Sequence, residues 1–128
     1  MQYHHDWFMR QIEEMVSMLG RMVFGKEGYG LSQRAQYPGV QETESELFTR
    51  LMELIHRGEI CQAENLLYEH ISLDLPDNFP VAVEFYRQLN LLSDSQLEAQ
   101  DFSREEILEG LTEVCRVYGV DPMLGFMP

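Results

Sequence analysis

The sequence predicts an all-α protein: a compact bundle of five or six helices in one domain that spans residues 1–128. Apolar residues recur every three or four positions along most of the chain, which is the spacing of one helical face. No segment alternates apolar and polar residues as a half-buried strand does. A chain of 128 residues that is 45% apolar and 24% charged is also large enough to enclose one core.

The first helix is expected from about His4 to Phe24. It holds half of the eight methionines of the chain, and apolar residues cover more than one of its faces. Two explanations fit this pattern: a central helix buried on two sides, or an adaptable surface for a partner or for a second copy of the chain. The residues of this possible partner surface are Trp7, Phe8, Met9, Met15, Met18, Met22 and Phe24.

Residues 25–41 are predicted to form a long irregular connection, because they hold four glycines and a Pro38–Gly39 turn signal. The glycines surround Lys26, which is the one lysine of the chain. A phosphate-binding loop is not expected here. Such a loop follows a strand and has Ser or Thr after its lysine, whereas this segment follows a helix and has Glu27.

Residues 43–73 are expected to form a tight helical hairpin around Gly58. Thr43 and Glu46 have the spacing of a capping box, so the first arm should begin there. The run from Gly58 to Leu67 resembles the middle of a tetratricopeptide-type hairpin, in which a glycine turn is followed by an apolar residue and a small alanine. One copy alone cannot build the extended groove of a solenoid, so a lone tetratricopeptide-like hairpin is expected.

A fourth helix is expected over about Pro80–Leu91, because proline suits the first turn of a helix. Ser93 or Asp94 should then cap a short helix that runs through about Ala99.

The last helix has the clearest boundaries in the sequence. Ser103 and Glu106 fit a capping box, and Gly119 is expected to end the helix. The tail that follows, residues 120–128, is unusually apolar for a chain end. It is expected to dock either on its own domain or on a partner.

The net charge of −13 is confined to one part of the chain. Residues 1–40 sum to zero, whereas residues 41–128 hold 18 acidic and 5 basic groups. Nucleic acid is therefore not an expected partner, since Lys and Arg must neutralise its phosphates. No apolar stretch is long enough for a membrane span, and Asp and Glu interrupt the N-terminal segment where a signal peptide would be apolar. Two cysteines far apart, both in apolar helical patterns, favour a reducing, cytoplasmic setting.

No catalytic, metal-binding or cofactor-binding group is predicted. His56 and His70 lie on the two arms of the hairpin, on the order of 15–20 Å apart, which is too far to share a metal ion. The carboxylates lie mostly at helix starts or on polar faces, where solvated surface is their ordinary role. A protein without an enzymatic activity is therefore favoured over an enzyme.

The leading hypothesis is a non-enzymatic protein–protein interaction module that acts through the first helix, the hairpin face or both. Its partner would be an unknown protein or a second copy of the chain. One alternative is a small enzyme or ligand-binding protein with a pocket between the first helix and the hairpin. The other is an acidic decoy that sequesters a basic partner.

Four runs along the chain also carry a family resemblance. They are Phe24-Gly25-Lys26-Glu27, the stretch Gly58–Leu67 continuing to Tyr68-Glu69, the pair Phe85-Tyr86, and the run Phe102–Leu111. In this order they resemble a family of small, uncharacterised, all-helical proteins of low-GC Gram-positive bacteria, catalogued as a domain of unknown function. The resemblance implies a helical fold and a bacterial, cytoplasmic setting. It implies no catalytic or binding residues.

Overall fold

The computed structural model describes residues 2–24 and 42–120, with side chains over 6–21 and 46–120. These residues form helices and no strand, so the all-α prediction is confirmed. The predicted linker, nearly all of the predicted apolar tail and the side chains of Met22 and Phe24 lie outside these described parts. The helices are α1 (Gln2–Phe24), α3 (Glu42–His56), α4 (Ile60–Tyr68), α5 (Asn78–Asn90), α6 (Asp94–Ala99) and α7 (Arg104–Val117).

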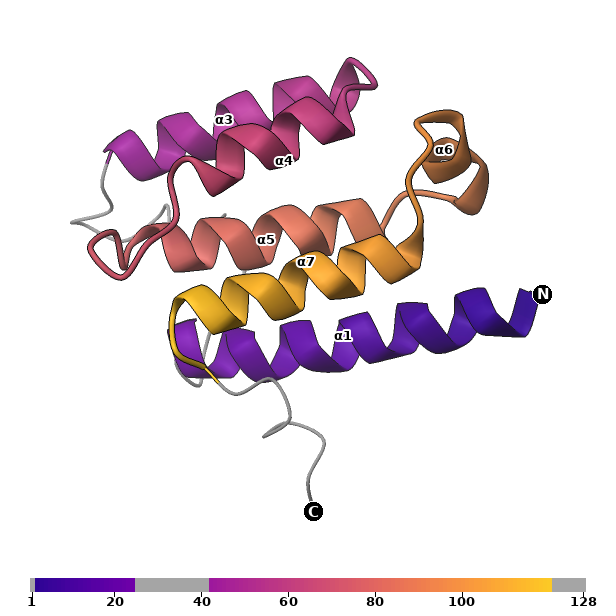
Figure 1. Ribbon diagram of the computed structural model, residues 1–128, viewed down its shortest axis with the longest axis horizontal. Helices are drawn as coiled ribbons and strands as arrows, with labels where there is room; N and C mark the ends of the chain where they lie inside the picture. The colour runs from indigo at the N-terminus through magenta and orange to yellow at the C-terminus, as the bar shows by residue number, and fades with distance from the viewer. Residues whose placement is uncertain (1, 25–41, 121–128) are drawn as a thin grey trace.

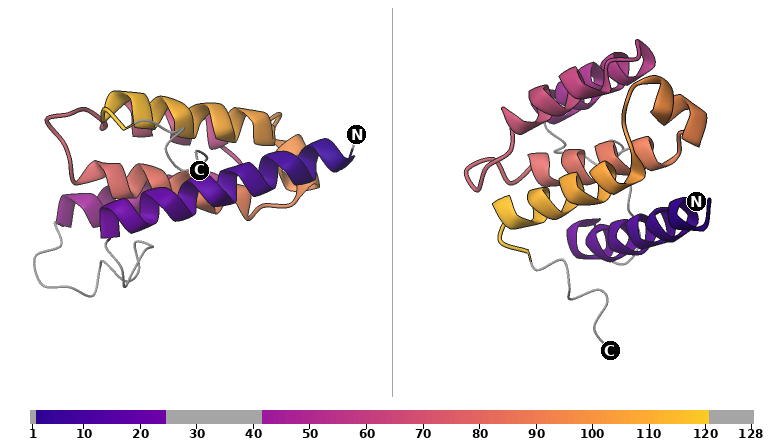
Figure 2. Two further views of the ribbon diagram at one scale, coloured as in Figure 1. Left: turned by 90° about the horizontal axis from the view of Figure 1, so that it is seen from below. Right: turned by 45° about the vertical axis from the view of Figure 1, so that its right-hand side comes forward.

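The helices lie in layers around α5 (Figure 1). Helices α3 and α4 pair antiparallel on one side, as the predicted hairpin, and α3 also packs on α5. Helix α7 packs along α5, and α1 packs on both α5 and α7 from the other side. A second view shows the same order, with α1 and the hairpin separated by α5 and α7 (Figure 2). Among the described helices, α5 and α7 thus lie between α1 and the hairpin, where one alternative from the sequence places a pocket.

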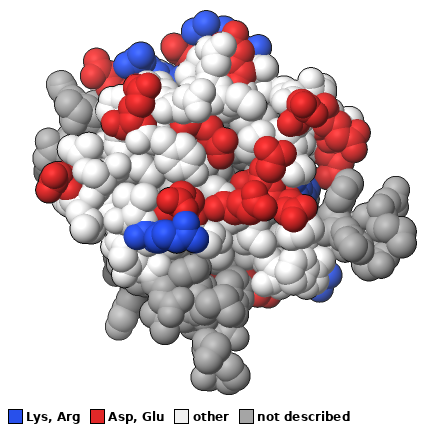
Figure 3. Space-filling view, viewed as in Figure 1, with Lys and Arg blue, Asp and Glu red and all other residues white. Residues whose placement is uncertain are grey.

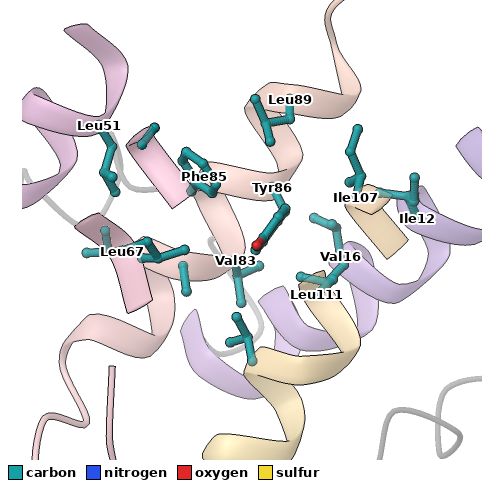
Figure 4. Packing of buried hydrophobic residues seen from close by; sticks show 14 of the residues in the cluster. Ile12, Val16, Leu51, Leu67, Val83, Phe85, Tyr86, Leu89, Ile107 and Leu111 are labelled. Atoms are coloured by element: carbon teal, nitrogen blue, oxygen red, sulfur yellow. The ribbon is translucent and has the colours of Figure 1, made fainter. Parts of the chain in front are cut away.

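Helix α5 is the central helix of the bundle, because it is buried on most of its circumference. Figure 4 shows Leu51 and Leu67 of the hairpin on one side of its aromatic pair, and Ile12 and Val16 of α1 on the other. The buried residues of α5 are Pro80, Val81, Ala82, Val83, Glu84, Phe85, Tyr86, Leu89 and Asn90. The sequence-based candidate for a central helix was α1. Instead, α1 buries one broad face and leaves Arg10, Glu14 and Ser17 exposed.

Glycine ends two of the helices by the same geometry. Gly58 has a φ of +79° and Gly119 a φ of +73°, a left-handed conformation that other residues adopt only with strain. At the first turn Glu59 N–H donates to the Leu54 carbonyl (2.9 Å), and at the second Val120 N–H donates to the Cys115 carbonyl (2.8 Å). Both turns are Schellman motifs, which satisfy helix-terminal carbonyls and stop the helix.

Helix starts agree with the sequence at two of three caps. Ser93 accepts a hydrogen bond from Gln96 N–H in a full capping box, and Ser103 accepts one from Glu106 N–H. Helix α3 begins at Glu42, so Thr43 lies inside its first turn rather than at the predicted capping position. The N-terminus of α4 is capped by a residue distant in sequence, because Ile60 N–H donates to Oε1 of Gln100 at 3.0 Å.

A buried arginine holds one end of the bundle together. Arg104, only 4% exposed, donates to Oδ1 of Asp94 (3.0 Å) and to the Leu92 carbonyl (2.7 Å). It also donates to both oxygens of Asn90, the backbone carbonyl at 3.0 Å and Oδ1 at 2.9 Å. The amide of Asn90 in turn donates to the Met9 carbonyl at 3.3 Å. Through these bonds α7 is tied to α5, α6 and α1.

Replacing this arginine is expected to destabilise the fold strongly. In Arg104→Met the carbonyls of Asn90 and Leu92 lose their donors in a buried place, so the free energy of unfolding should fall by about 2–4 kcal/mol. Urea denaturation followed by circular dichroism measures this change. The matched control is Arg116→Met, since Arg116 is exposed and pairs with Glu113 one helical turn away. Its cost should stay below about 0.5 kcal/mol, and equal costs for the two variants would contradict the role of Arg104.

Candidate interaction surface

Tyr86 extends from the central helix α5 into the space between α4 and α7. Its side chain is fully buried, and its hydroxyl donates to Oε2 of Glu64 at 2.6 Å. The hydroxyl of Tyr68 lies 3.1 Å from that of Tyr86. A tyrosine has one hydroxyl proton, and that of Tyr86 points to Glu64, so Tyr68 is the donor in the second bond. The three residues form a chain of hydrogen bonds that joins α4 to α5.

A glycine makes room for this tyrosine on the other side. Gly110 lies in the middle of α7 and is buried. A Cβ atom at this position would stand 2.3 Å from the Tyr86 hydroxyl oxygen and 2.4 Å from its Cζ, closer than any real side-chain contact. Gly110 therefore allows α7 to pass beside Tyr86, although glycine costs about 1 kcal/mol relative to alanine within a helix.

Carboxylates surround the two tyrosine hydroxyls. Partial burial raises the pKa of Glu64, the hydrogen bond from Tyr86 lowers it in part, and the negative charge of Glu106 raises it further. The pKa of Tyr68 is raised in the same way, by burial and by the charges of Glu64 and Glu113, against the hydrogen bond with Tyr86. Burial also raises the pKa of Tyr86, with the charge of Glu64 adding to it, so this phenol stays neutral.

Glu106 and Glu113 lie on the same stripe of α7 as Gly110, at spacings of four and three residues. Glu64, Tyr68, Glu106 and Glu113 are called the acidic seam below. Figure 3 shows acidic side chains gathered over the middle of this face, with fewer basic ones among them. Glu113 pairs with Arg116 at the outer edge. Within the described parts of the chain, no basic side chain forms an ion pair with Glu64.

The loop from Ser72 to Asp77, called the leucine loop below, exposes two large apolar side chains. Leu73 is 71% exposed and Leu75 is 43% exposed. The backbone that carries them is nevertheless held in place, because the Tyr118 hydroxyl donates to the Leu75 carbonyl (2.8 Å) and accepts from Ser72 N–H (3.3 Å).

Two further contacts fasten the ends of the leucine loop. Asn78 donates from its side-chain amide to the His70 carbonyl at 2.6 Å, and Phe79 stacks on Tyr118 with ring centroids 4.8 Å apart. The backbone that carries the two exposed leucines is therefore held in place at both ends of the loop.

The predicted partner surface on α1 is divided by the structure. Met15 and Met18 belong to the core, because they share the buried stripe of Ile12. Trp7 is 50% exposed and packs edge-on against Phe8 at 5.0 Å. Phe8 and Met9 are half-buried. Among the predicted residues whose side chains are described, those that reach the surface are therefore Trp7, Phe8 and Met9.

A groove of about 320 Å³ lies between α1 and α5. It is lined by Glu13, Val16, Ser17, Arg87, Asn90 and Leu91. Two of its polar side chains, Arg87 and Asn90, already have partners. Arg87 donates to both oxygens of the buried Glu84 (3.0 and 2.7 Å), and the Asn90 side chain bonds to Arg104 and to Met9. The groove therefore offers few free polar groups for catalysis.

The other sequence-based candidates do not converge. His56 is exposed, and Nδ1 of His70, in the turn after α4, lies 2.9 Å from the Leu66 carbonyl in the last turn of that helix. Over the described ranges, no group of three or more His, Cys, Asp or Glu side chains is arranged to hold a metal ion. Cys115 is buried, whereas Cys61 is exposed on α4. No helix in the part of the chain that was searched is long and apolar enough to cross a membrane.

The fold and this surface define a small helical domain with one acidic face and one fixed apolar loop. The chain belongs to a family of unknown function, DUF6483, whose model matches residues 2–119. No curated protein and no solved structure matches the chain. The family resemblance seen in the sequence is thereby confirmed at the level of a family of unknown function with a helical structure.

The contact between Gly110 and Tyr86 predicts that the effect of Gly110→Ala on the free energy of unfolding changes sign when Tyr86 is also replaced. Gly110→Ala alone should lower the free energy of unfolding by about 2–4 kcal/mol, because the added methyl group collides with a buried ring. In a Tyr86→Leu background the collision is absent. There the same substitution should be neutral or stabilise by up to about 1 kcal/mol, since alanine is the better helix former. Urea denaturation of the four proteins measures both effects, and an equal loss in both backgrounds would disprove the contact.

Glu64 predicts a second stability effect, which depends on pH. The raised pKa of Glu64 means that the folded state disfavours the charged form. The contribution of Glu64 to the free energy of unfolding is therefore fully present at low pH. That contribution is lost as the pH rises from the unfolded pKa through the folded one. Glu64→Gln keeps an acceptor for Tyr86 and removes the buried charge, so it should raise the free energy of unfolding at pH 7.

The gain from Glu64→Gln should shrink towards pH 4, as urea denaturation across this range can test. Other titratable groups that face Glu64 are Tyr86, Tyr68 and Glu106, and both tyrosines stay neutral over this range. Glu109→Gln removes an exposed charge from α7 and is the matched control, with a smaller and flatter effect. A loss of stability in Glu64→Gln at pH 7 would contradict the cost assigned to this charge.

Proposed function

We propose that this protein is a non-enzymatic protein–protein interaction module and that the leucine loop is its apolar contact. The observation that carries the proposal is the exposure of Leu73 and Leu75 on a backbone that Tyr118 fixes. Large apolar side chains exposed together are typical of binding surfaces. A fixed backbone loses little conformational entropy when a partner binds, so these leucines can contribute most of their burial to affinity.

The acidic face supplies polar residues beside the leucine loop. Protein interfaces commonly have an apolar centre within a polar rim, and a few central residues carry most of the binding free energy. Here Tyr68, 37% exposed, lies on the last turn of α4, four residues before the loop. It extends the apolar contact toward the carboxylates of the acidic seam.

The other hypotheses receive less support from the geometry. Over residues 6–21, the exposed part of the predicted α1 surface consists of Trp7, Phe8 and Met9, which leaves a smaller area there for a partner or for a second copy of the chain. An enzyme or ligand-binding protein would need free polar groups in a pocket, and two of those in the α1–α5 groove, Arg87 and Asn90, already have partners.

The proposal includes a bacterial, cytoplasmic setting, and it includes a lone tetratricopeptide-like hairpin formed by α3 and α4. It leaves out nucleic acid and membranes as partners, because a net charge of −13 disfavours anionic surfaces.

Peptide selection against the whole chain tests the proposal. Random peptides displayed on phage are selected on the wild-type protein, and the affinity of the enriched peptides is measured by fluorescence anisotropy. Leu73→Ser with Leu75→Ser should weaken binding by about tenfold or more, as expected when central apolar contacts are removed. Both side chains are exposed, so the double variant should remain folded, which circular dichroism verifies.

The control for this experiment is Leu91→Ser. Leu91 is 64% exposed at the other end of α5, so it matches the loop leucines in exposure but not in place. It should leave affinity unchanged. The proposal is wrong if no enriched peptide depends on the leucine loop, or if Leu91→Ser weakens binding as much as the loop variant does.

A further inference from the structure

We infer that the partner of the leucine loop is a basic segment, whose Lys or Arg side chain binds in the acidic seam beside Tyr68 while its apolar residues contact Leu73 and Leu75. The inference rests on the proposed function and adds the chemistry of the partner.

The acidic seam and the leucine loop form one continuous surface. Tyr68 ends α4, and the connection that leads into the loop begins at the next residue. On α7, Tyr118 follows the seam residue Glu113 by little more than one turn and bonds directly to the loop at Ser72 and Leu75. A short peptide segment can therefore touch the carboxylates and the leucines at once.

Charge selects the partner, because within the described residues only one carboxylate of the seam, Glu113, has a basic partner, Arg116. Over the described residues, no Lys or Arg pairs with Glu64 or Glu106. Tyr86 donates to Glu64, and Ser103 donates from its hydroxyl to Glu106 at 3.2 Å, but both donors are neutral. A cation from outside would offset the cost of the partly buried Glu64 carboxylate.

The aromatic ring of Tyr68 offers a second contact for the partner's Lys or Arg side chain. Its ring is partly exposed, and its hydroxyl is anchored to Tyr86, so the ring is held at the side of the seam. The face of a tyrosine ring attracts ammonium and guanidinium groups, and more strongly where carboxylates lie nearby. Arg or Lys can thus lie against the ring while reaching Glu64 or Glu113.

The same charge argues against the other occupants of this surface. A second copy of the chain would bring another acidic seam against the first, and each copy carries a net charge of −13. Nucleic acid and acidic peptides meet the same repulsion. A neutral apolar peptide would satisfy the leucine loop but would leave the seam uncompensated.

Two displayed peptide libraries separate these cases. Both have the same apolar positions, but one allows Lys and Arg at its polar positions and the other allows only Gln, Ser, Asp and Glu. Binders are expected from the basic library. Glu64→Gln with Glu113→Gln should weaken them by about tenfold, and added salt should weaken them in wild type more than in this variant.

The matched control is Glu46→Gln with Glu53→Gln. Both residues are exposed on α3, so this variant changes the net charge equally but leaves the seam intact. It should change affinity by less than about twofold. An equal loss in both double variants would show general attraction to an acidic protein and overturn the inference.

The outcomes also separate the inference from the proposed function. If the library without Lys and Arg gives equally tight binders that depend on Leu73 and Leu75, the interaction module stands and the basic partner is wrong. If basic peptides bind through the seam but ignore the leucine loop, the apolar contact is wrong. If neither library gives binders that depend on either feature, both proposals fail.

Discussion

The contact between Tyr86 and Gly110 is the constraint on which the arrangement around α5 depends. One tyrosine reaches two other helices from the central one: its hydroxyl bonds to Glu64 on α4, and its ring lies against the backbone of α7. The spacing of α4 and α7 is therefore set by a single buried side chain. A larger residue at position 110 displaces α7, and a smaller one at position 86 leaves a cavity and removes the bond to α4.

The ends of the bundle are held by a different means, since there long side chains of α7 and its C-cap reach loop backbone. Arg104 bonds to the carbonyls of Asn90 at the end of α5 and of Leu92 after it, and Tyr118 bonds to the leucine loop at the other end of the bundle. Backbone groups that lie outside helices need partners, and these side chains supply them. The same bonds that complete the fold make the leucine loop rigid, so its suitability for binding follows from its folding.

Features that depend on neighbouring residues could be predicted from the sequence. The caps at Ser93 and Ser103 and the stop at Gly119 are local, and the structure has them where the sequence places them. The central helix was misassigned because α5 contains Glu84 and Arg87, which make its pattern look amphipathic. Glu84 is in fact buried, and Arg87 and Gln88 satisfy it within the same helix. The methionines of α1 suggested a partner surface, but two of them, Met15 and Met18, lie in the core.

The acidic seam could not be predicted, because Glu64, Tyr86 and Glu106 are distant in sequence and meet only in the fold. Gly110 was the one local signal, since a glycine inside a strong helix indicates a close approach. The chemistry of Glu64 then argues for a role beyond packing. Tyr86 needs only an acceptor, and a neutral amide would provide it without the cost of burying a charge. On this argument the cost of the partly buried charge is offset in the folded chain only by the hydrogen bond from Tyr86. The basic partner that we infer would supply the positive charge that offsets the rest.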